Sequence, residues 1–249
     1  MMKFFFKKLL RFQHTYFPLP LFIYKHFFKI KILHKLFYKY YLLCFDTDLN
    51  YNKPNTAEFN QSYWLSKRSL YWHYAHLHHN RFSEIVDKVL IQFYHLFENK
   101  KVCDYMSGMG PFLKDKKYDL MFIEGNKYCC DILKKNYPKS RVINGKWDVI
   151  EKYQNEIDTL FVSSGCLIYL NNKDIDKFFK ITHKIKNFVF IHEGTDLEDF
   201  STQYSGHNYW NFEKRLKLYN LNYHNSEISF EKVNDEGIFS YFVYSEKKV

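Results

Sequence analysis

The spacing of apolar and polar residues changes along the chain, and each change predicts a different kind of element. Between residues 57 and 97 apolar residues recur at steps of three and four, the spacing of one face of a helix, and Ser83 is the expected cap. After residue 100 short apolar runs alternate with polar, helix-like stretches. Strands that alternate with helices predict an α/β fold, in which helices cover both faces of a mostly parallel sheet.

The predicted elements of this second part follow one another closely. Two apolar runs close the chain, separated by Asn234-Asp235-Glu236-Gly237, which is typical of a hairpin turn. The predicted strands cover residues 101–105, 119–124, 140–143, 158–163 and 187–192, with a closing antiparallel pair near 226–233 and 238–246. The predicted helices cover residues 111–117, 126–136, 173–184 and 208–219.

The start of the chain differs in composition from the rest. Residues 1–45 carry nine Lys or Arg and no Asp or Glu, whereas the remaining residues carry 28 bases and 27 acids. Residues 46–55 are polar and contain a proline, as linkers often do. We therefore expect a basic, helical N-terminal extension with its linker over residues 1–55, and one α/β domain over residues 56–249.

Bulky apolar residues are interleaved with the bases of this extension. Its longest stretch without Lys or Arg, residues 12–24, contains two prolines, whereas a membrane-spanning helix needs roughly 20 apolar residues. Three roles stay open. The extension binds an anionic membrane surface, it docks on the domain as a pair of helices, or it contacts nucleic acid. Because the bases lie outside the domain, nucleic acid is the least favoured partner.

The cysteines indicate a compartment. There are five, an odd number, and Cys129 is adjacent to Cys130, which is unlike a disulfide framework. A reducing, cytoplasmic location is expected, with peripheral association at the inner face of the membrane if the extension binds lipid.

Two of the predicted strands lead into an acid. Asp104 is followed by a loop with Ser107, Gly108 and Gly110, and Glu124 closes the next strand. Glycine lets the backbone pass close to a ligand, and a carboxylate accepts hydrogen bonds from both hydroxyls of a ribose. The sequence therefore predicts a nucleotide-cofactor site at the carboxyl edge of the sheet.

Over about residues 100–246 this arrangement resembles the Rossmann-like, seven-stranded methyltransferases that use S-adenosylmethionine (SAM). The resemblance implies a seven-stranded sheet that closes with a C-terminal antiparallel hairpin. It also implies that Glu124 binds the ribose of SAM. The methionine part of SAM is expected at the loop, on Asp104, Ser107, Gly108 and Gly110.

Further positions follow from the same resemblance. Asp148 matches the residue that contacts the adenine amino group, the alternative being a solvated loop acid, and Trp147 either covers the adenine or belongs to the core. Ser163 lies in the turn expected beside the sulfonium. Met106 departs from the family, because it stands where the first glycine of the loop would be, and the helix after the loop is about one turn short.

The predicted fifth strand ends at His192 and Glu193, at the edge where open α/β folds bind ligands. Either residue is a candidate general base that takes a proton from an acceptor hydroxyl, the alternative being an ordinary strand end. The family's Asn/Asp-Pro-Pro-Tyr/Phe signature for amino-group and nucleic-acid methylation is absent, and Ser163-Ser-Gly-Cys166 stands there. We therefore favour methyl transfer to a hydroxyl oxygen of a small molecule or a glycan.

Residues 71–81 are rich in histidine. His73 and His76, or His76 and His79, are one helical turn apart, but no cysteine or acid stands nearby in sequence, so no metal is expected. This segment is expected to lie over the cofactor site and contact substrate, or to form a polar helix surface.

Two other function classes remain as alternatives to SAM-dependent methyl transfer. A nicotinamide-dependent oxidoreductase would carry Gly-x-Gly-x-x-Gly, and Leu113 occupies its third glycine position. The second alternative is a non-catalytic protein that binds SAM or serves as a membrane adaptor.

Overall fold

The chain forms two compact units, one of residues 1–79 with 202–207 and one of residues 80–201 with 208–249. The computed structural model describes residues 2–27, 30, 33, 36, 38, 40, 62–76, 80–110, 112–113, 118–163, 167–193, 200–201, 208–211, 214–215, 218, 231–232 and 238–245. The predicted linker at residues 46–55, and with it the predicted domain boundary, lies outside the described residues.

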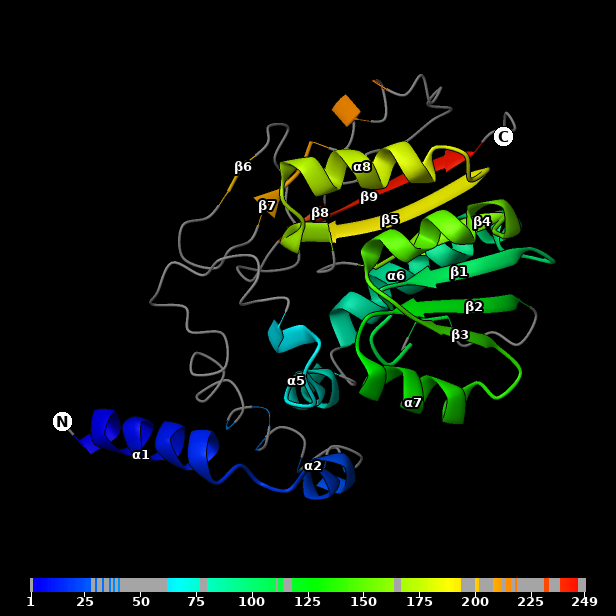
Figure 1. Cartoon of the computed structure of the whole chain (residues 1–249). Coiled ribbons are helices and arrows are strands. Elements are labelled where there is room, and N and C mark those ends of the chain that lie inside the picture. The colour runs from blue at the N-terminus through cyan, green and yellow to red at the C-terminus, as the bar shows by residue number, and fades with distance from the viewer. Residues whose placement is uncertain are drawn as a thin grey trace. The chain divides into compact units, whose positions relative to one another are not determined.

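The second unit is built on a sheet in which five parallel strands lie in the order β3-β2-β1-β4-β5 (Figure 1). The strands are β1 Lys101–Tyr105, β2 Asp119–Glu124, β3 Arg141–Asn144, β4 Thr159–Val162 and β5 Asn187–Glu193. The chain winds outward from β1 in both directions, so the strand order reverses between β1 and β4, where open α/β sheets bind their ligands. This sheet confirms the predicted α/β class.

Antiparallel segments lie beyond β5. β9, Ile238–Ser245, pairs antiparallel with β5, and β8, Glu231–Lys232, pairs antiparallel with β9. The turn of the predicted C-terminal hairpin, at residues 234–237, lies outside the described residues. A separate small sheet joins β6, Phe200–Ser201, to β7, Asn208–Tyr209.

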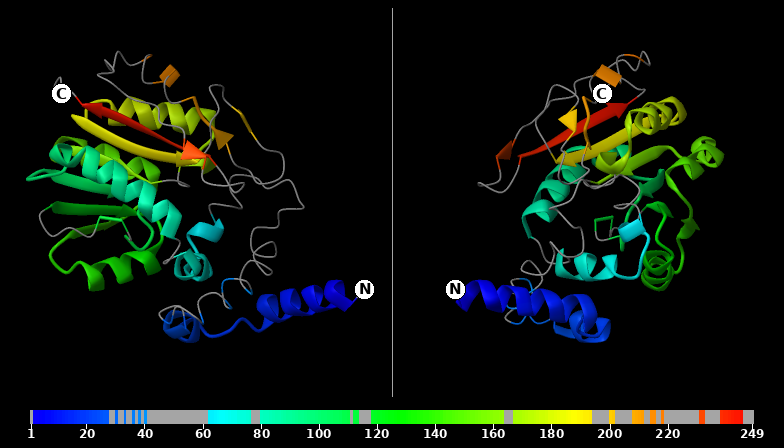
Figure 2. Two further views of the ribbon diagram at one scale, coloured as in Figure 1. Left: turned by 180° about the vertical axis from the view of Figure 1, so that it is seen from behind. Right: turned by 60° about the vertical axis from the view of Figure 1, so that its left-hand side comes forward.

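Helices pack on both faces of the parallel sheet, which can be followed from two further directions in Figure 2. One apolar cluster joins α6, Asn80–Gln92, and α7, Lys127–Asn136, to one face, and a second joins α8, Asn172–Thr182, to the other. Because side chains alternate along a strand, Asp104 and Glu124 belong to the face of α6 and α7. Short 3-10 helices complete the unit: η1 Tyr94–Leu96, η2 Trp147–Lys152, η3 Gln154–Glu156 and η4 Leu167–Tyr169.

Asparagines cap two of the helices. Asn126 Oδ1 accepts a hydrogen bond from the Tyr128 amide at 2.9 Å at the start of α7, and Asn171 does the same for Asp174 in α8. The predicted cap of α6, Ser83, is wrong. The helical backbone begins at Asn80, so Ser83 lies inside the helix and not at its start.

One predicted helix is wrong at its start, and another is wrong at the positions that the structure describes. Within 208–219, Asn208–Tyr209 form β7, and the buried Trp210 donates its Nε1–H to the Leu167 carbonyl at 3.0 Å. Burial of this indole gives the segment an extended start, although residues 214, 215 and 218 are helical. Within 111–117, residues 112–113 are not helical, because Leu113 fills the core on the α6 face, and the rest lies outside the described residues.

The first unit contains α1, Met2–Tyr16, α2, Leu21–Phe27, and α5, Ser69–His76. The Tyr71 hydroxyl donates to the Leu19 carbonyl at 2.6 Å, and the Arg68 guanidinium donates to the His14 carbonyl at 3.1 Å. The N-terminal segment thus docks on Arg68 and Tyr71. The sequence placed these residues in the α/β domain, whereas the structure groups them with α1 and α2.

No helix in the described part of the chain combines the length and the apolar character that crossing a bilayer requires.

Candidate functional site

The loop that follows β1 has an unusual backbone. Its first amide, that of Met106, donates to the Ile123 carbonyl of β2 at 2.6 Å, so the loop begins beside β2. Met106, Gly108 and Gly110 have positive φ angles of 50°, 57° and 64°. Met106 therefore adopts a left-handed conformation that favours glycine, at a cost of about 1–2 kcal/mol for an L-residue.

Gly110 is required by space as well as by conformation. A Cβ atom there would lie 2.7 Å from Leu133 Cδ2 and 3.1 Å from Phe122 Cε1, both parts of the packed core. The Gly110 amide donates to the Ser107 carbonyl at 2.9 Å, and its carbonyl accepts from the Tyr137 hydroxyl. The loop therefore packs at Gly110 directly on side chains of β2 and α7, with no room for a side chain of its own.

Glu124 holds the centre of the site. Its carboxylate is buried, with Oε2 accepting from the Gly108 amide at 2.8 Å and Oε1 accepting from the Asn126 amide at 2.7 Å. Burial raises the pKa of Glu124 to about 7, although the hydrogen bonds from the backbone amides of Asn126, Gly108 and Gly125 act to lower it. Each carboxylate oxygen keeps a second lone pair, so both can still accept from a ligand hydroxyl.

Asp104 is fully buried on the neighbouring strand, and among the described residues neither of its carboxyl oxygens has a hydrogen-bond partner. The Ser107 hydroxyl is also buried, and among the described residues it has no hydrogen-bond partner. Burial, and secondarily the negative charge of Glu124, raises the pKa of Asp104. Because unsatisfied buried polar groups are costly, this arrangement fits a ligand that brings hydrogen-bond donors or positive charge.

The other predicted cofactor residues lie at different places. Ser163 is buried and follows Val162, which pairs with Tyr105 of β1, so it lies at the same edge as the loop. Asp148 is exposed in η2, and no described contact joins it to Glu124. The structure thus brings together Asp104, Ser107, Gly108, Gly110 and Glu124, with Ser163 at the same edge of the sheet and Asp148 exposed in η2.

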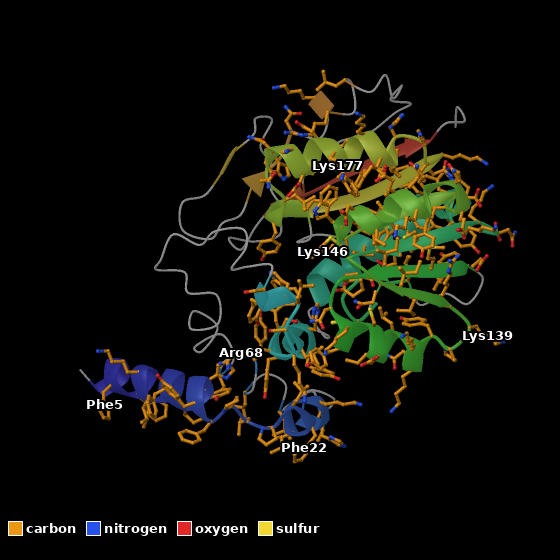
Figure 3. The ribbon with its side chains drawn as sticks, in the orientation of Figure 1. Phe5, Phe22, Arg68, Lys139, Lys146 and Lys177 are labelled. Carbon is orange, nitrogen blue, oxygen red and sulfur yellow. The ribbon has the colours of Figure 1, made fainter. Side chains whose placement is uncertain are left out.

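The residue before Asp148 is fixed to the core. The Trp147 carbonyl accepts from the Tyr105 hydroxyl, and its partly buried ring packs against the apolar cluster of α8. Lys177, labelled in Figure 3, places its Nζ 5.4 Å from the centroid of the Trp147 ring. The ring of Trp147 therefore packs with the core, which is one of the two alternatives that the sequence left open for it.

The candidate general bases end β5. His192 pairs with Ser240 and Glu193 pairs with Phe239 of β9, so the backbone of both lies at the carboxyl edge of the parallel sheet. The positions of their side chains lie outside the description.

Three residues of the site were missed by sequence reasoning. Asn126 donates its amide to Glu124, Tyr137 donates its hydroxyl to Gly110, and Asn144 Nδ2 donates to the carbonyl of Glu124 at 2.9 Å. A signal existed for Asn126, because it stands between a strand-end acid and a helical run, where a cap is expected. Tyr137 and Asn144 reach the site only through the fold.

The described cysteines Cys103, Cys129 and Cys130 are buried free thiols. Within the described part of the chain no group of three or more His, Cys, Asp or Glu side chains is placed to hold a metal ion. In the histidine-rich segment, the His73 ring packs on Trp64 and Trp72 within the first unit, and residues 77–79 lie outside the described residues.

The raised pKa of Glu124 predicts how stability depends on pH. The pKa is about 7 in the folded protein against 4.5 for an ordinary glutamate, so the unfolded state loses its proton first as the pH rises. The stabilising contribution of the protonated group is complete below about pH 4.5 and is lost as the pH rises to about 7, a change on the order of 3 kcal/mol.

Glu124→Gln removes this titration. We expect the free energy of unfolding of this variant, measured by urea titration at several pH values, to fall by on the order of 3 kcal/mol less than that of the wild type between about pH 4.5 and 7, while the contribution of Asp104, whose pKa burial also raises, remains. Glu151→Gln, which removes an exposed carboxylate, is the matched control. Parallel pH profiles for the wild type and Glu124→Gln would show that Glu124 does not titrate in this window.

No family model matches the chain, and no curated protein matches it. Among solved structures, a SAM-dependent methyltransferase from Leishmania major superposes with a TM-score of 0.54 at 15% identity, over 79% of this chain and 80% of that one. The magnesium protoporphyrin IX methyltransferase of Synechocystis PCC 6803, solved with bound SAM, gives a TM-score of 0.52 at 9% identity, over 77% and 98%.

At these identities the likeness is one of fold. The predicted resemblance is confirmed at that level: the chain has the Rossmann-like fold of SAM-dependent methyltransferases.

Proposed function

We propose that this protein binds SAM where β1 and β2 end and transfers its methyl group to an acceptor. The observation that carries the proposal is the buried Glu124 carboxylate, which two backbone amides hold beside a glycine loop and a second buried acid, Asp104. A carboxylate at this place suits a ribose, and a buried acid without a described partner suits a positively charged amino group.

Each predicted residue has a role in this proposal. Glu124 accepts hydrogen bonds from the two ribose hydroxyls, while Asp104 and Ser107 face the methionine part of SAM. Gly108 leaves the backbone open for close approach, because it carries no side chain, and Gly110 lets the loop pack against the core so that it holds this position. When bound, SAM supplies a methyl group on a positively charged sulfonium.

The positions of Ser163 and Asp148 in the fold support two further roles. Ser163 borders the sulfonium, since it follows β4 at the edge where the loop lies. Asp148 contacts the adenine amino group, a role that its exposed place in η2 leaves accessible.

Methyl transfer is an in-line displacement, so most of the catalysis comes from aligning the acceptor with the methyl group. We propose a hydroxyl oxygen as acceptor, on a small molecule or a glycan, with His192 or Glu193 taking its proton. The sequence Ser163-Ser-Gly-Cys166, which stands in place of the amino-methylation signature, supports an oxygen acceptor.

The remaining proposals concern organisation and location. β8 and β9 are the strands of the C-terminal hairpin that completes a seven-stranded sheet, and the extension with its linker covers residues 1–55. The enzyme works in the cytoplasm at the inner face of a membrane, which the nine bases of residues 1–45 favour.

The alternatives are weaker on specific observations. A dinucleotide fingerprint needs a glycine at position 113, and Leu113 is instead fully buried in the core. A non-catalytic SAM-binding protein would share the whole cofactor site, so it differs from an enzyme only in failing to transfer the methyl group.

Glu124→Ala should weaken the binding of SAM by roughly 1.5–3 kcal/mol, the scale of hydrogen bonds to a charged group. This corresponds to a Kd about 10 to 150 times higher. Calorimetry on the full chain measures it, with Glu151→Ala as the matched surface control. An unchanged Kd would remove Glu124 from the site, and binding of NADH in place of SAM would favour the oxidoreductase.

The double variant His192→Ala/Glu193→Gln should keep its affinity for SAM and lose about 10²–10⁴-fold in rate, the usual effect of removing a general base. The measurement is transfer of labelled methyl groups from SAM into the sugar and lipid fractions of a cell extract. His95→Ala, which removes an exposed histidine, is the control. Wild-type transfer by the double variant would assign the proton to another group, with residues 73–79 as the next candidates.

A further inference from the structure

Helix α1 has two faces that differ in burial. His14 is fully buried, with its ring centroid 5.7 Å from that of Tyr71, and its carbonyl accepts from Arg68, so this face is docked within the first unit. A second face carries apolar side chains spaced by four, three and four residues, which lie in one stripe on a helix. The α1 stripe consists of Phe5, Leu9, Phe12 and Tyr16, each between 52% and 70% exposed.

The exposed apolar surface is concentrated in this part of the chain. Of the twelve large apolar side chains that are exposed among the described residues, nine belong to residues 5–36. They include Phe17 and, on α2, Phe22, which is labelled with Phe5 in Figure 3. Single exposed apolar residues are ordinary on a protein surface, but a grouped set marks a surface that contacts something apolar.

The charge of the same helix selects the partner. Lys3, Lys7, Lys8 and Arg11 all lie in α1, and no acid occurs before residue 46. Two copies of so basic a surface repel each other, which disfavours self-association through the stripe. Nucleic acid would bind the bases but would leave the four large apolar side chains of the α1 stripe without contacts. A partner with an anionic surface layer over an apolar interior matches both the bases and the apolar side chains of α1.

We propose that α1 binds the surface of an anionic lipid bilayer, lying in the plane of the interface. The α1 stripe enters the boundary between headgroups and acyl chains, the exposed Lys8 beside the stripe contacts the headgroups, and the net positive charge of the helix attracts it to the anionic surface. With 15 residues at about 1.5 Å each the helix is too short to span a bilayer, and it lies flat instead. This inference rests on the proposed membrane location and not on methyl transfer.

Docking and membrane binding are then compatible. The His14 face fixes α1 to Arg68 and to Tyr71 of α5 while the stripe stays available, so less conformational freedom is lost when the stripe meets lipid than for an unattached segment. The structure therefore assigns the two roles considered for the extension to two faces of one helix.

The test is co-sedimentation of the full chain with phosphatidylcholine vesicles that contain or lack phosphatidylserine, at low and high salt. We expect binding to the anionic vesicles at low salt and its loss at high salt, because exposed electrostatic contacts are screened over about 8 Å at physiological ionic strength. Phe5→Gln/Leu9→Gln/Phe12→Gln should lower the bound fraction at least about tenfold. Ile91→Gln, which removes an exposed side chain from α6, should bind as the wild type does.

A bound fraction of the triple variant equal to that of the wild type would overturn the proposal. Binding to duplex DNA in place of vesicles, or a lipid-free dimer that the triple variant abolishes, would also overturn it by assigning the surface to another partner. Circular dichroism and SAM calorimetry on the triple variant show whether it is folded. Failure of the wild type to bind SAM would refute the proposed function and leave the membrane result standing.

Discussion

The buried carboxylate of Glu124 is the interaction on which the architecture of the site depends. It accepts from the Gly108 amide on one oxygen and from the Asn126 amide on the other, so it joins the loop after β1 to the first turn of α7. Asn144 and the Gly145 amide hold the Glu124 carbonyl from the next strand. Glu124 therefore joins the loop after β1 and the start of α7 through its side chain, and the end of β3 through its backbone carbonyl, at the edge of the sheet where ligands bind.

This arrangement is not the most stable one that the fold permits. Burial raises the pKa of both Asp104 and Glu124, and the two acids lie on the same face of neighbouring strands. Removing a carboxylate from water without full compensation is costly, and proteins retain such costs where function requires them. A ligand with ribose hydroxyls and a positive amino group supplies the donors and the charge that this pair lacks.

The sequence predicted the parallel strands well because each is a short apolar run between polar breaks, and because an acid at or near a strand end is a local feature. It failed where tertiary burial decided the backbone, as when Trp210 takes an extended path into the core in place of a helix. Tyr137 and Asn144 also escaped prediction, since both reach the loop or β2 through contacts distant in sequence. The apolar and basic residues of the extension were visible, but which of them face outward depends on the docking of His14.

The central claim is that the ends of β1 and β2 form a SAM site organised by Glu124. The most direct measurement is a crystal structure of the full chain with S-adenosylhomocysteine, the demethylated product of SAM. The account predicts that both ribose hydroxyls donate to Glu124, at the roughly 2.5–2.7 Å typical of hydroxyl–carboxylate hydrogen bonds, with the amino group beside Asp104. A ligand bound elsewhere, or a Glu124 carboxylate that contacts only the Gly108 and Asn126 amides in the complex, would contradict it.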